Sequence, residues 1–349
     1  MHTLPRSQRK PTLEQVARYA GVSRATVSRV VNGSTTVDPA IREVVQQAVE
    51  DLNYVPNQAA RALMTKRTDT LTLVAAETDT RVFGDPFFAQ IVRGVSHELT
   101  GSPVRLTLSM TQTDEEIAAL ARYLAAGHSD GVLLISEHGG HRLAEQLVDA
   151  GIPVVIGGRP LDPRLEVPYV DNDNRGAARR AAQYLKERGR TKVATITGPQ
   201  DMSAGLDRLE GFAEGLGRDF RRGRVEHGDF TMGSGEAAAQ RLLERHPDID
   251  GIFIASDLMA LGAVSTLRKA GRRVPDDIAI VGFDDIDLAR MAEPSLTTMR
   301  QETETQGRVM ARLLLQTLGL PPTGPIPEPN TPDGRGIVQD VTLVERDSV

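Results

Sequence analysis

A chain of 349 residues is long enough for two or three structural units with cores of their own. It contains no cysteine, which excludes disulfide bonds and thiolate metal sites and is typical of a reducing cytoplasm. No stretch approaches the roughly 18 apolar residues that span a bilayer, and the polar, basic first residues are not typical of a secretory signal. We therefore expect a soluble, cytoplasmic protein without membrane contact.

The net charge of −6 is distributed unevenly along the chain. Residues 1–67 contain ten Lys or Arg and five Asp or Glu, a balance of +5, so the remainder carries −11. A basic head on an acidic body is typical of a nucleic-acid reader with a separate sensing domain. Short basic segments also occur by chance, so this asymmetry supports a motif but does not replace one.

Residues 12–32 carry the most specific pattern of the chain. A first helix is predicted from small and apolar residues spaced i, i+3, i+4 and i+7: Leu13, Val16, Ala17 and Ala20. Gly21 permits a tight reversal, and the hydroxyl of Ser23 can cap a second helix. The outward face of that helix suits a major groove and its phosphates: Arg24, Ala25, Ser28 and Arg29. The pattern predicts a helix-turn-helix that reads DNA.

Two more helical segments precede the main body of the chain. Asp38 is suited to cap, and Pro39 to begin, a third helix that ends near Asn53. Residues 58–64 are rich in helix formers, but so short a helix is marginal alone. This segment either becomes ordered against DNA or a partner chain, or it is an ordinary linker.

From Leu71 onward, apolar runs alternate with helix-period stretches. The runs predict strands at 71–76, 104–110, 131–135, 154–156, 193–197, 251–255 and 278–283, with a last strand near 336–343. The stretches between them predict helices at 114–126, 142–150, 175–188, 236–245 and 258–270. This alternation is typical of an α/β fold with parallel sheets covered by helices.

The helix-turn-helix sequence has the form A-x-x-A-G-V-S-x-x-T-V-S-R-V-x-N and resembles the N-terminal motif of the lac repressor (LacI/GalR) family. Five later blocks stand in the order that this family has: GDPFFAQIVRGV (84–95), VDNDNRGA (170–177), DRLEGF (207–212), SDLMALGA (256–263) and VGFDD (281–285). The resemblance covers nearly the whole chain. It implies a transcriptional regulator with an all-α DNA-binding domain and an α/β effector domain of two parallel-sheet subdomains, similar to periplasmic binding proteins.

The resemblance also implies domain boundaries. The expected parts are a DNA-binding domain at 1–54, a hinge helix and linker at 55–68, and an effector-binding and dimerisation domain at 69–349. The last divides into an N-subdomain, about 69–169 and 300–320, and a C-subdomain, about 170–299 and 330–349.

By the same resemblance, base choice falls to Arg24, Ala25 and Arg29. Phosphate contact and orientation fall to Thr12, Ser23, Thr26, Ser28 and Asn32. In the hinge, the implied DNA contacts are Asn57, Ala60, Arg61 and Leu63, with Leu63 wedged into a base step from the minor groove. Without the resemblance, a lone leucine there is more often core. Since so few contacts per subunit cannot select a genomic site, we expect a dimer on a palindromic operator.

In open α/β sheets, a ligand lies beyond the carboxyl ends of the strands. The residues expected there combine carboxylates, guanidinium groups, hydroxyls and rings, as sugar binding requires: Asp85, Phe87, Phe88, Ser136, Arg159, Arg208, Phe230, Ser256, Asp257 and Asp284. The resemblance makes Arg208 and Asp284 the polar anchors and Phe88 and Phe230 the ring platforms. It places Gln301 on a crossover between subdomains. The alternative for each phenylalanine is core packing.

Two residues depart from the family pattern, and no motif for a metal, a phosphate or a catalytic nucleophile is complete. Gly158 stands where the lac repressor has a carboxylate, and Ser256 where it has an amide, which favours a roomier pocket for a di- or oligosaccharide. Residues 171–182 begin like a calcium loop but lack its closing glutamate, and His138 and His141 have no partner motif and are expected to be solvated. No phosphate-binding loop or nucleophile elbow is visible, so we expect no metal, no cofactor and no enzymatic activity.

The sequence therefore predicts a homodimeric repressor of a carbohydrate-utilisation operon that a small sugar releases from its palindromic operator. The absence of a leucine heptad after Gly336 favours a dimer over a tetramer. Two alternatives stay open. One is a solute-binding protein of sugar transport, which would need a signal peptide and no basic head. The other is a co-repressor-dependent regulator that responds to a non-sugar metabolite.

Overall fold

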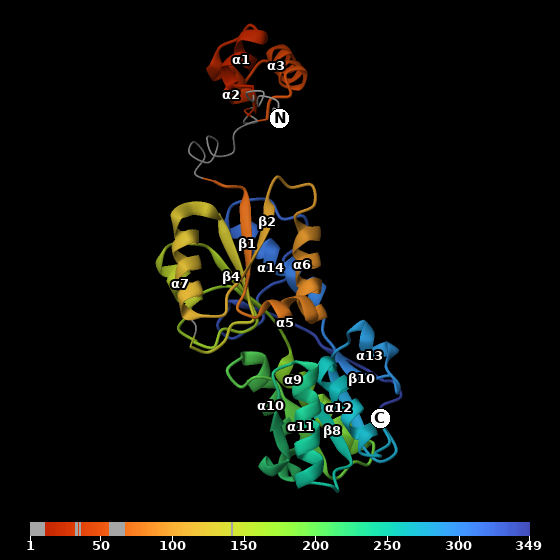
Figure 1. Cartoon of the computed structure of the whole chain (residues 1–349). Helices are drawn as coiled ribbons and strands as arrows, with labels where there is room; N and C mark the ends of the chain where they lie inside the picture. Colours follow the sequence, from red (N-terminus) through yellow and green to blue (C-terminus); the bar gives the residue numbers. More distant parts are fainter. Residues whose placement is uncertain (1–10, 32–33, 35, 56–66, 141) are drawn as a thin grey trace, which may run out of the picture. The chain divides into compact units, whose positions relative to one another are not determined.

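The structure, a computed structural model, describes residues 11–31, 34, 36–55, 67–140 and 142–349. The chain divides into two compact units, Met1–Thr68 and Asp69–Val349 (Figure 1). In the described residues, the first unit is helical and the second contains the strands.

The first unit is built from three short helices: α1 (Leu13–Tyr19), α2 (Arg24–Val31) and α3 (Pro39–Asp51). Thr12 caps α1 in a reciprocal capping box with Gln15, and Asp38 caps α3. The Thr26 amide donates a hydrogen bond to the Ser23 hydroxyl at 3.1 Å, which confirms the predicted cap of α2. Small apolar side chains join the three helices in one core: Val16, Ala17, Val27, Val30, Val37, Val45, Ala48 and Tyr54.

The first of two sheets in the second unit has the strand order β11-β5-β4-β3-β1-β2 and is parallel. Its strands are β1 (Thr70–Ala75), β2 (Arg105–Met110), β3 (Gly131–Ile135), β4 (Val154–Gly157), β5 (Tyr169–Asn172) and β11 (Gly336–Gln339). The central strands β1 and β3 are apolar and almost wholly buried, because helices cover both faces of the sheet.

The second sheet has the order β12-β10-β9-β8-β6-β7. Its strands are β6 (Val193–Thr197), β7 (Val225–His227), β8 (Gly251–Ile254), β9 (Ala279–Asp284), β10 (Thr297–Arg300) and β12 (Thr342–Val344). The edge strand β12 runs antiparallel to β10, and the others are parallel. The predicted α/β class with two parallel-dominated sheets is confirmed.

Helices cover both faces of each sheet (Figure 1). The first sheet packs against α6 (Pro86–Glu98) and α14 (Thr303–Thr317) on one face, and against α7 (Asp114–Tyr123) and α8 (Leu143–Asp149) on the other. The second packs against α9 (Asn174–Glu187) with α10 (Ser203–Leu216), and against α11 (Met232–Arg245) with α12 (Asp257–Lys269). Two short helices, α5 (Asp79–Gly84) and α13 (Asp287–Met291), follow β1 and β9.

The chain passes between the sheets after β5, after β10 and after β11. The single strand expected near 336–343 is therefore two strands, β11 in the first sheet and β12 in the second. Both β5 and β11 lie in the first sheet, whereas the expected C-subdomain contained residues 170–172 and 330–349. The sequence reasoning missed β5, β7 and β10 because each has only three or four residues, several of them polar.

Candidate functional site

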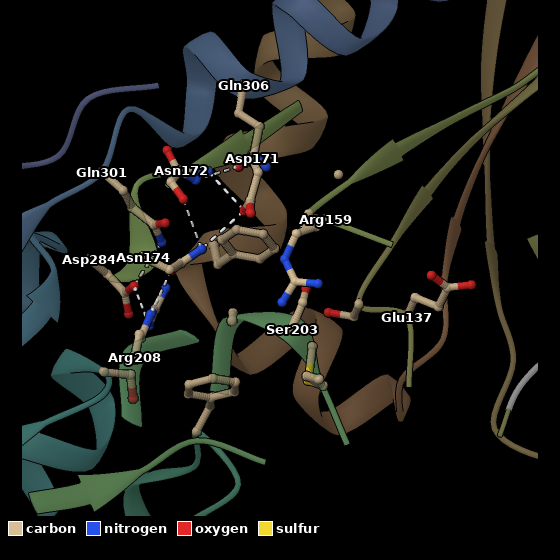
Figure 2. A pocket seen from close by; sticks show the side chains of 18 of the residues that line it. Glu137, Arg159, Asp171, Asn172, Asn174, Ser203, Arg208, Asp284, Gln301 and Gln306 are labelled. Atoms are coloured by element: carbon tan, nitrogen blue, oxygen red, sulfur yellow. Dashed lines mark hydrogen bonds and ion pairs between the residues drawn. The ribbon is translucent and has the colours of Figure 1, made fainter. Parts of the chain in front are cut away.

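A cavity of about 720 Å³, open to solvent, lies beyond the carboxyl ends of strands from both sheets (Figure 2). The strand ends contribute a mainly polar lining: Ser136, Gly158, Arg159, Asp171, Asn172, Ser256, Asp284 and Gln301. Helix α10 adds residues of its first turns, including Ser203 and Arg208.

Arg208, which is 5% exposed, connects the polar groups at one end of the cavity. Its Nε donates to Asn174 Oδ1 at 2.8 Å, and its Nη1 donates to the Ala255 carbonyl and lies 3.7 Å from Asp284 Oδ1. Gln301 Nε2 donates to the same Asp284 oxygen at 2.7 Å. Burial raises the pKa of Asp284 well above its usual value, and the positive charge of Arg208 opposes that shift. The two predicted anchors and Gln301 therefore lie together.

A chain of amide hydrogen bonds continues from this cluster. Asp171 Oδ1 accepts from the Asn172 backbone amide at 2.8 Å and from Asn174 Nδ2 at 3.0 Å. Asn172 Nδ2 donates to Gln306 Oε1 at 3.1 Å, and Gln306 Nε2 donates to the Val170 carbonyl at 2.8 Å. The Asn172 side chain is buried, and its Oδ1 has no partner among the described residues. An unpaired buried acceptor costs about 1–3 kcal/mol.

The two neighbouring phenylalanines differ in where they lie. Phe87 lines the cavity, whereas Phe88 is 1% exposed in the core of the first sheet, with its ring edge-on to Phe87. The ring of Phe230 also lines the cavity, and the guanidinium groups of Arg81 and Arg208 lie 5.1 Å and 5.6 Å from its centroid. Phe230 and Phe87 can therefore meet a ligand, while the expected platform Phe88 lies behind the wall.

Asp257 also lies behind the cavity, not along it. Its carboxylate accepts from the Thr298 hydroxyl at 2.7 Å and from the Ile286 amide at 3.1 Å. Complete burial raises its pKa to about 7. Asp257 holds the loop after β9 in place. It was expected to contact the effector, but it does not line the cavity. Ser256 does line the cavity, although its hydroxyl caps α12 by accepting from the Met259 amide.

Side chains from the two sheets meet across the cavity mouth. Arg159, which follows β4, donates two hydrogen bonds to Asp207 of α10, at 2.7 Å and 3.2 Å. His138, which follows β3, lies 3.2 Å from Glu77 and 2.8 Å from Asp201. The hydrogen bond with Glu77 is the largest contribution to the raised pKa of His138, and burial opposes it. His138 is therefore held between carboxylates, and the expectation that it is solvated was wrong; His141 lies outside the described residues.

The electrostatics of the lining favour a neutral, hydroxyl-rich ligand. Burial raises the pKa of Asp85, that of Asp171 to about 6, and that of Glu137 to about 7, the last with added repulsion from Glu145. The arginines described in the lining each have a carboxylate partner: Arg81 with Glu77, Arg159 with Asp207, and Arg208 with Asp284. The charge of each arginine is thus balanced by a carboxylate, and neutral hydroxyl groups can add to the existing network.

Within the described ranges, no group of three or more His, Asp or Glu side chains is arranged to hold a metal ion. The segment that begins like a calcium loop starts at Asp171 and Asn172. Asp171 accepts a hydrogen bond from the Asn172 backbone amide, and the Asn172 side chain donates one to Gln306. No helix of the described residues is long and apolar enough to cross a membrane.

On the first unit, Ser23, Arg24, Ala25 and Arg29 are exposed, and Thr26 and Ser28 are partly buried. Arg24 Nε lies 3.1 Å from Glu14 of α1 in a pair exposed on both sides. Such a pair is worth about 0–1 kcal/mol, so Arg24 can exchange it for a base or a phosphate. The Thr12 hydroxyl accepts from the Gln15 amide at 3.3 Å. The remaining predicted DNA contacts lie outside the described residues: Asn32, Asn57, Ala60, Arg61 and Leu63.

The sequence reasoning missed several residues of the cavity lining: Arg81, Glu137, Asp171, Asn172, Asn174, Ser203 and Gln306. The strand-end rule would have found Asp171 and Asn172 if the short strand β5 had been recognised. Glu137 was within reach, because it directly follows Ser136 at the end of a predicted strand. Ser203 begins α10 and Gln306 lies in the first turn of α14, two helices that the sequence reasoning did not predict, so no local signal marked them.

A helix-turn-helix unit and a two-sheet unit with a polar cavity define a DNA-binding regulator with a small-molecule site. Residues 12–57 match the family described as bacterial regulatory proteins, lacI family, and residues 182–349 match the periplasmic binding protein-like domain. The HTH-type transcriptional regulator CelR of Thermobifida fusca is 50% identical over 326 residues, covering 92% of this chain and 95% of that protein. The chain belongs to the lacI family of bacterial regulatory proteins.

Other relatives agree with this membership. The ribose operon repressor of Halalkalibacterium halodurans is 37% identical, over 88% of this chain and 90% of that protein. A solved CelR–cellobiose complex matches with a TM-score of 0.75 at 46% identity, covering 97% of this chain and all of that one. A lac repressor dimer bound to operator and the anti-inducer ONPF matches with a TM-score of 0.82 at 26% identity, covering 97% and 99%. The predicted family and DNA-binding regulatory function are confirmed, so the chain is a transcriptional repressor and not a transport protein.

Proposed function

We propose that the chain acts as a homodimer on a palindromic operator and is released by a neutral disaccharide of the cellobiose type. The observation that carries the proposal is the convergence of Arg208, Asp284 and Gln301 in a cavity that Phe230 also lines. Charged and amide groups can pair with adjacent sugar hydroxyls, and an aromatic ring can pack on the C–H face of a pyranose. The relative solved with cellobiose supports the sugar class.

The wall at Gly158 bears on the size of the effector. Its backbone φ is 110°, and a Cβ built there would lie 3.7 Å from Ser203 Oγ, an ordinary van der Waals contact. The glycine therefore leaves a narrow space between β4 and α10 that a side chain would fill. The roomier pocket expected from the sequence is compatible with this space, and the choice of two sugar rings rests on the relative solved with cellobiose.

On the DNA side, Arg24, Ala25 and Arg29 would choose bases, with Ser23, Thr26 and Ser28 positioning the helix on phosphates. The effector would act by binding one arrangement of the protein better than the operator-binding arrangement, because a ligand shifts an equilibrium only through differential affinity. The coupling free energy is typically about 1–3 kcal/mol. This role needs binding alone, and we propose no catalytic step.

The test is an operator titration followed by fluorescence anisotropy, with the full chain and a palindromic site selected from random DNA. Cellobiose is expected to weaken operator binding roughly 5- to 150-fold, and glucose and ribose much less. Release by ribose but not by cellobiose would contradict the sugar assignment. Tighter operator binding with cellobiose would mean co-repression and would contradict release.

A further inference from the structure

Glu137 is a charged residue of the cavity for which the described structure provides no hydrogen-bond partner. It follows β3, lines the cavity and is partly buried. The charged group known to act on it is Glu145 of α8, which is repulsive and is itself paired with Arg142. The other cavity carboxylates are engaged, Asp284 with Gln301, Asp171 with Asn174 and Asp85 with the Phe87 amide.

The position of Glu137 separates it from the cluster that would bind the first sugar ring. Figure 2 shows Glu137 at the opposite side of the cavity from Asp284 and Gln301, with Arg159 and Ser203 between them. A ring held by Arg208 and Asp284 therefore leaves Glu137 unoccupied. A ligand that reaches both ends must extend past Arg159 and Ser203.

The wall between the two ends is suited to such a ligand. Gly158 has no side chain to fill the narrow gap toward Ser203, whose Oγ would lie 3.7 Å from a Cβ built there. Helix α10 begins at this gap, and its N-cap residue Met202 makes no side-chain capping hydrogen bond. The first amides of a helix without a side-chain cap need other acceptors, and sugar hydroxyl oxygens can supply them.

We propose that Glu137 determines specificity for the second ring of a disaccharide effector by hydrogen bonding to a hydroxyl of that ring. The inference rests on the proposed sugar-binding function of the cavity. A hydroxyl group suits this carboxyl in either protonation state, since the carboxylate accepts and the carboxylic acid both donates and accepts. Burial raises the pKa of Glu137 to about 7, so both states are populated near neutral pH.

The experiment compares Glu137→Leu, Glu137→Gln and wild type by isothermal titration calorimetry of the full chain with cellobiose and, at millimolar concentration, with glucose. Glu137→Leu keeps the size of the side chain and removes its hydrogen bonding, so cellobiose affinity should fall about tenfold. Glucose affinity should stay within about twofold, because the first ring does not reach Glu137. Glu137→Gln retains hydrogen bonding and should bind cellobiose more tightly than the leucine variant.

Glu145→Gln is the matched control, because it removes the neighbouring charge without altering the lining; its cellobiose affinity should stay within about twofold of wild type. Unchanged operator binding without sugar shows that each variant is folded. If Glu137→Leu leaves cellobiose affinity unchanged, or weakens glucose and cellobiose equally, the inference is overturned. If wild type binds neither sugar, the proposed function itself fails, which is a different result.

Discussion

The two functional surfaces of this protein are built in opposite ways. The predicted DNA contacts that the structure describes lie close together in the sequence, at Thr12 and within 23–29, and most of them are exposed. The cavity residues come from strand ends and helices between Arg81 and Gln306, and a hydrogen-bond network around Arg208, Asp171 and Asn172 joins several of them. An exposed reading surface can therefore change with little effect on folding. A buried binding site couples ligand affinity to stability, and the predictions below test this difference.

The largest expected effect is the loss of folding stability on substitution of Phe88. Phe88→Ala removes a fully buried ring from the core of the first sheet and should lower the free energy of unfolding by about 3–5 kcal/mol. Phe87→Ala is the matched variant, since its ring lines the cavity; it should cost less stability and weaken cellobiose binding more. Urea denaturation and calorimetry measure the two quantities. The reverse ranking would show that Phe88, not Phe87, is the sugar platform.

At the DNA surface, Arg24→Ala should weaken operator binding by about 1–3 kcal/mol, or roughly 5- to 150-fold, if Arg24 reads a guanine. The free energy of unfolding should change by less than about 1 kcal/mol, because the partner Glu14 is also exposed. Glu14→Gln breaks the same ion pair and should leave operator affinity nearly unchanged. A large loss of stability in Arg24→Ala would contradict the view of this surface as independent of the fold.

A smaller effect concerns pH. Burial raises the pKa of Asp171 to about 6 from its ordinary value of 3.8, so the folded state holds this proton more tightly than the unfolded state. Its contribution to stability is therefore present at low pH and is lost as the pH rises from about 4 through 6. Asp171→Asn removes this loss, so the variant should gain stability relative to wild type between pH 4.5 and 7.5 in urea denaturation.

The control for this measurement is Asp162, a partly exposed residue whose pKa is lowered from 3.8 to about 2 by hydrogen bonds from Arg164. Its contribution is present above about pH 4 and is lost as the pH falls from about 4 through 2, so Asp162→Asn should run parallel to wild type from pH 4.5 to 7.5. Parallel curves for Asp171→Asn as well would show that Asp171 is not the titrating group.

The same contrast explains how much could be predicted from the sequence. The DNA-reading helix pair follows from local spacing, a reversal at Gly21 and a cap at Ser23, so its fold could be derived within twenty residues. The long apolar strands, such as β1 and β3, were equally clear because both of their faces are buried.

The cavity was predicted only in part because its geometry depends on tertiary structure. Asp257 comes shortly after β8 and Asp284 ends β9, and only packing places Asp284 along the cavity and turns Asp257 toward Thr298. Phe87 and Phe88 are adjacent in the sequence, but neighbouring side chains of a helix point in different directions. The way α6 packs on the sheet therefore decides which of the two rings lies in the core. Asn172 went unnoticed because β5 is too short to give a periodic signal.

The central claim is that Arg208 serves the effector and not the operator. Its direct test is the operator affinity of wild type and Arg208→Met, each with and without cellobiose, after circular dichroism has shown that both are folded. We expect wild type and Arg208→Met to bind the operator equally well without sugar. Cellobiose should then release wild type but not the variant. Release of Arg208→Met by cellobiose, or loss of operator binding by the folded variant without sugar, would contradict the central claim.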